Sequence, residues 1–113
     1  PDQRVELAHR DDVVSAIHHA IAAPAATCQT FNIAGGSTWQ MTGRDYVERL
    51  YDLLGVSPDE ATYRTSPGWV DWYDTEASQQ LLKYQVTPYG TFLAQIEAEI
   101  AHLMGDIDEL EKP

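Results

Sequence analysis

The residues best suited to recognising a ligand form one run, residues 69–73, with the sequence Trp-Val-Asp-Trp-Tyr. If this run is extended, Trp69, Asp71 and Tyr73 share one face, because successive side chains of an extended chain alternate. Aromatic rings stack on the apolar face of a sugar, and a carboxylate accepts hydrogen bonds from its hydroxyl groups. The run therefore suits a sugar-like ligand. Burial in the core, or at an interface with another unit, is the simpler explanation of such aromatic residues.

The histidine and cysteine residues do not predict a metal or nucleophile site. His18 and His19 are adjacent, so a helix turns them about 100° apart and they cannot chelate one ion together. We expect both to face solvent. Cys28 is the single cysteine, which excludes an internal disulfide and a multi-cysteine zinc site, and it has no basic neighbour to activate its thiol. The sequence also lacks a glycine-rich phosphate loop and a nucleophile elbow, so we expect no catalytic, cofactor-binding or metal-binding residue.

Composition and charge restrict the class of protein further. The 113 residues are enough for one compact domain, and 18 acidic against 7 basic side chains give a net charge of −11. This charge argues against a nucleic-acid or anionic-membrane partner. The chain has no apolar run of the ~20 residues that span a bilayer and no signal peptide at its start. We expect a cytoplasmic protein, and the opening without methionine suggests a piece of a longer chain.

The first third of the chain alternates between strand and helix patterns. Residues 4–8 alternate like a half-buried strand, and Asp11 or Asp12 can cap a following helix, which Pro24 ends. Residues 30–33 read as a short buried strand, followed by a tight glycine turn. The helix that Pro24 ends has an apolar stripe, which we expect to face the core of the protein. It comprises Val13, Ile17, Ala20 and Ile21.

The remaining two thirds are predominantly helical. Thr42 and Asp45 form a near-capping box that opens a helix ending at Gly55, and residues 61–65 form a possible third strand. Asp74 or Thr75 caps a short helix, a last helix runs from about residue 91 to 104, and residues 106–113 form an acidic tail expected to be frayed. The fold class is therefore α+β, a small mixed domain over residues 1–105 with about four helices and two or three short strands.

Four segments, in this order and spacing, resemble the extended short-chain dehydrogenases/reductases of the NAD-dependent epimerase/dehydratase family. Residues 9–17 (His-Arg-Asp-Asp-Val-Val-Ser-Ala-Ile) resemble its His-Val-x-Asp-Val-Ala-x-Ala segment, and residues 30–36 (Thr-Phe-Asn-Ile-Ala-Gly-Gly) resemble its Tyr-Asn-Ile-Gly-Gly-Gly turn. Residues 42–55 are similar to its Thr-x-x-Glu-Leu…Leu-Gly helix, and residues 72–84 to its Asp-x-Ser/Thr-Lys-Ala…Leu-Gly-Trp/Tyr stretch. The matching family-motif residues are His9, Asp11, Asp12, Asn32, Gly35, Gly36 and Asp74.

The resemblance implies that the chain is the C-terminal, substrate-side part of an NAD(P)-binding Rossmann-type enzyme. In that family the glycine-rich cofactor loop and the Tyr-x-x-x-Lys catalytic pair lie upstream, and neither occurs here. The parent enzyme would use NAD(P) to oxidise a sugar-like alcohol transiently, with the tyrosine as base. The chain alone would bind no cofactor and would be inactive. Its partners would be the upstream NAD(P)-binding half and a small sugar-like substrate, within nucleotide-sugar metabolism.

One departure from the family pattern concerns the substrate. Family members acting on nucleoside-diphosphate sugars carry Arg-Pro-Gly-Asp before the last motif, whereas residues 66–69 here are Ser-Pro-Gly-Trp. Arg64 is the one basic residue near enough to replace the missing arginine. A smaller or less charged substrate is therefore at least as consistent with the sequence, and its candidate binding residues are Arg64, Trp69, Asp71 and Tyr73.

An alternative function follows from the last helix. Its apolar residues recur with the 3-4 spacing of a coiled-coil seam, although for only about two and a half heptads and with Gly105 as an interruption. A free-standing module that dimerises or docks on another protein through this helix is the alternative to an enzyme fragment. The residues of the seam are Leu93, Ile96, Ile100, Leu103, Ile107 and Leu110.

Overall fold

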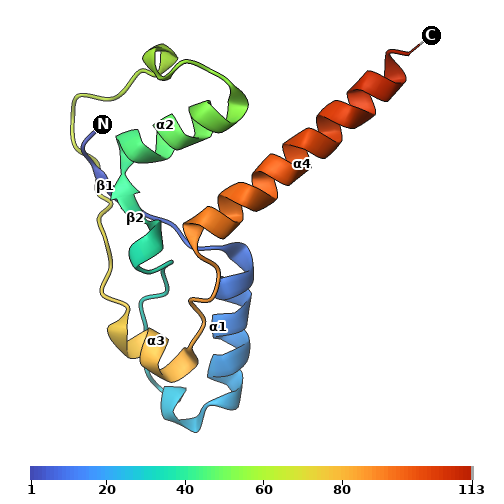
Figure 1. Ribbon diagram of the computed structural model, residues 1–113. Helices are drawn as coiled ribbons and strands as arrows, with labels where there is room; N and C mark the ends of the chain where they lie inside the picture. Colours follow the sequence, from blue (N-terminus) through green and yellow to red (C-terminus); the bar gives the residue numbers. More distant parts are fainter. Residues whose placement is uncertain (113) are drawn as a thin grey trace.

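The computed structural model describes residues 1–112 and shows a small mixed α+β arrangement with four helices and a two-stranded sheet, as predicted (Figure 1). Three single 3₁₀ turns lie in the connections. The helices and strands are β1 (Arg4–Glu6), α1 (Arg10–Ala22), β2 (Gln40–Thr42), α2 (Gly43–Leu54), α3 (Glu76–Leu82) and α4 (Tyr89–Leu110).

The sheet is a short antiparallel ribbon in which Val5 of β1 pairs with Met41 of β2. β1 is shorter than the predicted strand over residues 4–8, and β2 was not predicted from the sequence. Such a ribbon is marginal by itself and needs packing on one face. That packing comes from the buried Trp39 and Met41, which contact Tyr89 at the start of α4.

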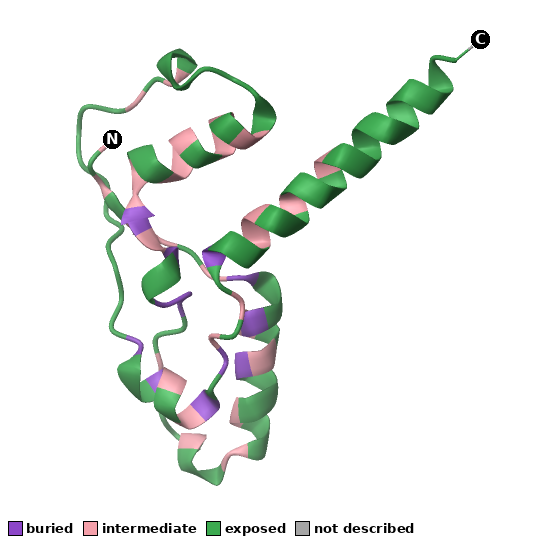
Figure 2. Ribbon diagram, in the orientation of Figure 1, coloured by how far each residue is buried: buried purple, intermediate pink, exposed green. Residues whose placement is uncertain are grey.

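A second small cluster of buried residues joins two helices. Ala16 of α1 packs with Leu82 of α3 and with Tyr84, which is completely buried. Other buried residues, among them His9, Asp12 and Ala34, lie outside these two clusters. Most of α4 is exposed, whereas α2 combines exposed and partly buried residues (Figure 2). The apolar core is therefore divided between two small clusters.

The molecule exposes more surface than a compact protein of its mass. Its accessible surface is 8274 Å², whereas a compact chain of 12.6 kDa exposes about 6,200 Å². Its radius of gyration is 17.9 Å, against about 13 Å for a compact domain of this length. The long helix α4 extends away from the rest of the chain and accounts for much of this shape (Figure 1).

The predicted inner face of α1 is partly correct. Ala20 packs against the cluster that contains Ala16, and Val13 is partly buried. Ile17, however, is 59% exposed and Ile21 is 83% exposed, while Asp12 and Ala16 are buried. The carboxylate of Asp12 binds the segment that leads into α4, and this contact rotates the helix so that both isoleucines face outward. α1 therefore presents an apolar row to solvent, which also includes Val14.

Two of the predicted strands do not form. Residues 30–33 and 61–65 are irregular chain and form no strand. A strand is stable only when a neighbouring strand pairs with its backbone, and within residues 1–112 neither segment has one. Thr30, Asn32 and Ile33 are exposed instead of buried.

The ends of α2 follow local sequence signals, whereas α4 ends later than predicted. The capping box of Thr42 and Asp45 opens α2, and Gly55 ends it with a left-handed φ of 71°. α4 continues through Gly105 to Leu110, six residues beyond its predicted end, so the acidic tail is helical and exposed up to there. Pro113 of that tail lies outside the described residues. Among residues 1–112, no helix combines the length and apolarity needed to traverse a bilayer.

Candidate functional site

Residues 64–74, called the arm here, run as irregular chain beside β1 and connect the region after α2 to α3 (Figure 1). The side chain of Gln3 fastens the arm: its Oε1 accepts a hydrogen bond from the Gly68 N–H at 2.7 Å, and its amide donates to the Val70 carbonyl. Glu6 accepts a hydrogen bond from the Tyr73 N–H at 2.8 Å. The arm is therefore positioned by the side chains of Gln3, next to β1, and Glu6, within β1, and not by strand pairing.

The aromatic cluster of the arm is divided between its two sides. The Trp72 indole donates a hydrogen bond to the Met41 carbonyl at 3.2 Å, so this ring lies against the ribbon. The Arg4 guanidinium lies 4.0 Å above the Trp72 ring and pairs with Asp71 at 3.0 Å. Trp69 is fully exposed, and Tyr73 is about half exposed. The arm thus offers Trp69 and Tyr73 to solvent while Trp72 holds it in place.

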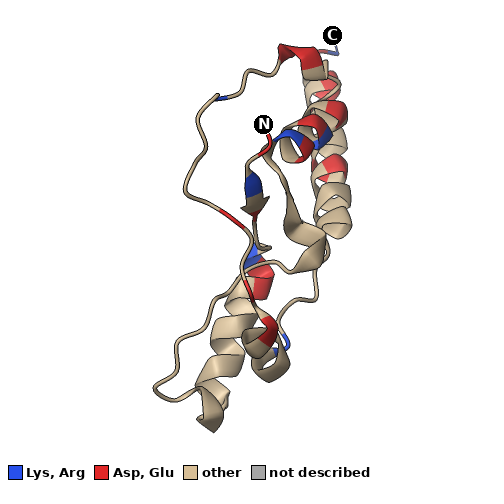
Figure 3. Cartoon of the chain, turned by 90° about the vertical axis from the view of Figure 1, so that its left-hand side faces the viewer, with Lys and Arg blue, Asp and Glu red and all other residues tan. Residues whose placement is uncertain are grey.

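Arg64 and Asp71 line the same cleft, together with Arg4, and its volume is about 360 Å³. Trp69 and Tyr73 lie outside the lining of this cleft, so the structure brings together only part of the predicted set. Figure 3 shows basic residues on β1, whereas α4 carries acidic residues along its length. The lining holds two arginines, Arg4 and Arg64, and two aspartates, Asp2 and Asp71, so the side-chain charges of the cleft balance within a strongly acidic chain. Arg64 forms no ion pair within residues 1–112 and is the group of the cleft that suits hydroxyl or anionic groups of a ligand.

The glycine turn is held by Glu6, a residue that the sequence analysis did not single out. Its Oε1 accepts a hydrogen bond from the Gly36 N–H at 2.9 Å, while its Oε2 accepts from Gln40 at 3.1 Å. Gly36 has a φ of 86°, and a Cβ on Gly35 would lie 2.1 Å from the Leu7 carbonyl oxygen. Both glycines are thus required by the backbone, and the turn fixes β1 relative to the arm.

Asn32 and Asp74, which lie far apart in the sequence, meet beside α3. The Asn32 side-chain amide donates to the Asp74 carbonyl at 3.5 Å, and the Asn32 carbonyl accepts from the Ser78 hydroxyl at 2.8 Å. The Asp74 carboxylate accepts from the Glu76 N–H at 3.0 Å, next to the start of α3. Thr75, the alternative cap, is buried and makes no side-chain capping bond. The pair therefore fixes the end of the arm.

The predicted capping role of Asp11 and Asp12 is wrong, because His9 caps α1. The His9 Nδ1 accepts a hydrogen bond from the Asp11 N–H at 3.2 Å. Asp11 is exposed and pairs with Arg10 at 3.1 Å. Asp12 is buried, and its carboxylate accepts hydrogen bonds from the Val86 N–H and from the backbone and hydroxyl of Thr87.

His9 is buried beneath α4 rather than placed to bind a ligand directly. Since its Nδ1 accepts a backbone hydrogen bond, the neutral ring carries its proton on Nε2, which donates to the Gln95 side chain at 3.1 Å. The ring packs edge-on against Phe92, with centroids 6.1 Å apart. One ring nitrogen therefore caps α1, and the other joins the start of α1 to α4.

Tyr84 and Tyr89 are buried residues whose contacts had no sequence signal. The Tyr84 hydroxyl donates to the Ala34 carbonyl at 3.0 Å and accepts from the Ala34 N–H at 3.2 Å, which anchors the glycine turn to the end of α3. Burial raises the pKa of Tyr89, with a smaller contribution from Tyr46, while Arg49 opposes the shift. Neither tyrosine faces the arm cleft.

Residues suited to metal binding are dispersed in the described part of the chain. Within residues 1–112, no three or more His, Cys, Asp or Glu side chains gather as a metal site. His18 and His19 are exposed, and the His19 Nδ1 donates to the Leu82 carbonyl at 2.6 Å, which covers the end of α3. Cys28 is exposed, with a left-handed φ of 58°.

Comparisons with known proteins yield no relative: no family model, no curated protein and no solved structure matches this chain. The family resemblance therefore depends on the four sequence segments alone. The candidate site depends on the geometry of the arm and its cleft.

Proposed function

We propose that this chain is the substrate-binding part of an NAD(P)-dependent epimerase/dehydratase-like enzyme of the cytoplasm. It acts together with an NAD(P)-binding unit of the Rossmann type, which supplies the cofactor and the catalytic Tyr and Lys. The observation that carries this proposal is the arm, which exposes Trp69 and Tyr73 beside a cleft containing Arg64 and Asp71. The substrate is sugar-like.

Each group of the arm has a role that its chemistry supports. The exposed rings offer faces on which the apolar side of a sugar stacks. Asp71 and Arg4 pair with each other, so their charges largely cancel. Arg64 forms no ion pair within residues 1–112 and donates hydrogen bonds to hydroxyl or phosphate oxygens of the substrate.

The family-motif residues support the proposal through their structural roles. Asn32, Asp74, Gly35 and Gly36 form the scaffold that fixes the end of the arm next to α3. A motif whose members are distant in sequence but jointly position one segment is consistent with a substrate-binding region. Their contacts are structural, and the arm itself carries the recognition.

The excess surface supports the presence of a second unit. The chain exposes about 2,000 Å² more than a compact protein of its mass. A standard interface covers only about 800 Å² on each partner. The excess includes the apolar row of α1 at Val14, Ile17 and Ile21. An NAD(P)-binding unit that covers this row would bury the surface that the chain leaves exposed.

A second candidate function is protein interaction through α4, as in the alternative drawn from the sequence. The exposed residues Leu103, Ile107 and Leu110 favour it, because they lie on one face of a helix that extends from the molecule. The same helix carries several carboxylates, so two copies would repel each other in a homodimer.

The arm is tested by titrating the ¹⁵N-labelled chain with methyl glucoside, glucose 6-phosphate and inorganic phosphate. Both sugars should shift the backbone resonances of residues 68–73. Arg64→Gln should weaken glucose 6-phosphate binding about fivefold, because one exposed charge contributes up to about 1 kcal/mol. Methyl glucoside binding should change much less, because glutamine still donates a hydrogen bond to a hydroxyl group. Lys83→Gln, at the end of α3, is the matched control. Sugars that leave the resonances of the arm unchanged would contradict the proposal.

A further inference from the structure

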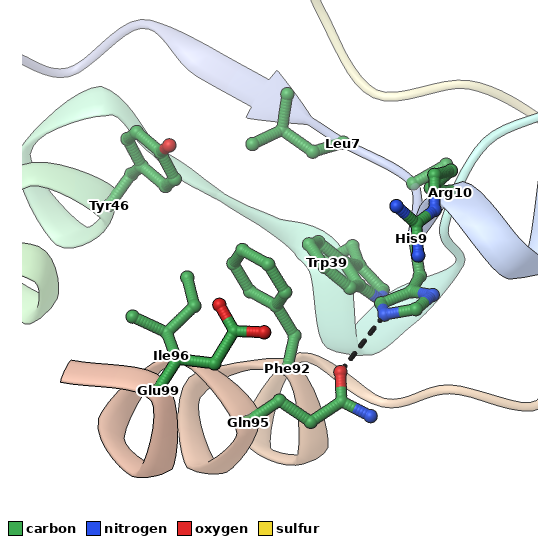
Figure 4. A pocket seen from close by; sticks show the side chains of 10 residues that line it. Leu7, His9, Arg10, Trp39, Tyr46, Phe92, Gln95, Ile96 and Glu99 are labelled. Atoms are coloured by element: carbon green, nitrogen blue, oxygen red, sulfur yellow. Dashed lines mark hydrogen bonds between the residues drawn. The ribbon is translucent and has the colours of Figure 1, made fainter. Parts of the chain in front are cut away.

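A second cavity lies at the base of α4, where this helix meets α1 and faces α2. Its volume is about 430 Å³, and Trp39, Tyr46 and Phe92 supply aromatic walls (Figure 4). It shares no lining residue with the arm cleft, so a ligand that binds in this cavity is distinct from the proposed substrate. An aromatic cavity of this size accommodates a small ring-containing molecule.

The polar groups of the cavity differ in what they can offer a ligand. His9 and Gln95 bind each other at 3.1 Å, so this wall has its hydrogen bonds already satisfied. Glu99 lies on α4 and lines the same cavity as Phe92 (Figure 4). Within residues 1–112 it forms no ion pair. The carboxylate of Glu99 is therefore available to a ligand.

The electrostatic environment favours a positive ligand. The faces of aromatic rings attract cations, and Glu99 adds a full negative charge beside them. The chain as a whole has a net charge of −11. Arg10 is the basic residue of the lining, but it is 87% exposed and pairs with Asp11 at 3.1 Å. The two ring nitrogens of His9 are already bound to the Asp11 N–H and to Gln95.

We propose that this cavity binds an organic cation, an ammonium group attached to a flat apolar ring. The ring packs among Trp39, Tyr46 and Phe92, and the ammonium lies between the Phe92 face and the Glu99 carboxylate. Recognition depends on the charge as well as on the apolar ring, because the aromatic walls alone would accept a neutral ring of the same shape.

Three probes of nearly the same shape and different charge test this site in the 113-residue chain. They are 2-phenylethylammonium, 2-phenylethanol and phenylacetate, and the readout is the indole N–H resonance of Trp39. This resonance is assigned by comparison with the Trp69→Phe and Trp72→Phe variants. The cation should bind about fivefold more tightly than the alcohol, and phenylacetate should bind most weakly.

Two variants separate the Glu99 charge from the net charge of the chain. Glu99→Gln should abolish the preference for the cation over the alcohol. Glu97→Gln makes the same charge change on the same helix outside the cavity lining and should preserve the preference. Each of four results would overturn the proposal. They are equal binding of the cation and the alcohol, tighter binding of phenylacetate than of the cation, a Trp39 resonance that no probe shifts, and equal effects of the two variants. None of these results bears on the arm.

Discussion

Asp12 connects two parts of the chain that are 75 positions apart in sequence. Its buried carboxylate accepts hydrogen bonds from the Thr87 N–H at 3.0 Å and the Thr87 hydroxyl at 2.7 Å, and from the Val86 N–H at 3.2 Å. A buried carboxylate is stabilised only when donors of this kind replace water. Asp12 therefore sets both the rotation of α1 and the position from which α4 starts.

Replacing Asp12 with alanine should strongly destabilise the fold. The substitution leaves three donors without their acceptor, and hydrogen bonds to charged groups contribute roughly 1.5–3 kcal/mol each. We expect Asp12→Ala to lower the free energy of unfolding by about 3 kcal/mol or more in urea denaturation. Asp11→Ala is the matched control: Asp11 is exposed, so this change should cost less than about 0.5 kcal/mol. Equal effects of the two substitutions would show that the hydrogen bonds of Asp12 to Val86 and Thr87 do not stabilise the fold.

The sequence could not reveal the role of Asp12. Asp11 and Asp12 both have the right type and position for a helix cap, which is a local feature, and the true cap His9 lies just before them. The donors of Val86 and Thr87 are visible only once the chain has folded. Glu6 was missed for the same reason, since its partners lie in the glycine turn and the arm.

α2 is the element whose ends agree best with the sequence. Thr42 and Asp45 act on the first turn of the helix and Gly55 on its last turn, so the residues that determine each end are adjacent to it in sequence. The strands predicted over residues 30–33 and 61–65 failed because strand formation depends on a pairing partner, which local pattern cannot supply. The ends of α2 were therefore predictable, whereas the pairing that strands 30–33 and 61–65 would need was not.

The capping box makes α2 sensitive to substitution. Thr42 accepts a hydrogen bond from the Asp45 N–H at 3.2 Å, and Asp45 accepts one from the Thr42 N–H at 3.2 Å. Thr42→Ala should lower the free energy of unfolding by about 1 kcal/mol. Thr91→Ala, at an exposed position of α4, should change it by less than about 0.5 kcal/mol.

The same box should respond to acid. The Thr42 N–H, followed by the Thr42 hydroxyl, lowers the pKa of Asp45 below its usual value of 3.8. The stabilisation is therefore complete above the unfolded pKa and is lost as the pH falls through the lower pKa of the folded state. Asp45→Asn should remove this part of the acid dependence in urea unfolding measured from about pH 5 to pH 2.5. An unchanged acid profile would contradict the assignment.

At the scale of the whole molecule, the large accessible surface is the main difference between the structure and the expectation from the sequence. The sequence composition indicated one compact domain, but the accessible surface of 8274 Å² and the radius of gyration of 17.9 Å describe an open molecule. Composition reports how much apolar material a chain has, and it does not report whether that material faces its own core. The outward row of α1 became visible only in the structure, whereas the apolar seam of α4 was already present in the sequence pattern.

The most direct test of the proposed function is to identify the natural polypeptide or complex that contains this sequence. It would be isolated from its source cells with an antibody against residues 1–112, sequenced by mass spectrometry and assayed for bound NAD(P) by fluorescence. We expect a glycine-rich cofactor loop and a Tyr-x-x-x-Lys pair in the same polypeptide or in a stoichiometric partner, with NAD(P) bound. A 113-residue polypeptide isolated alone, without such a unit and without nucleotide, would contradict the account.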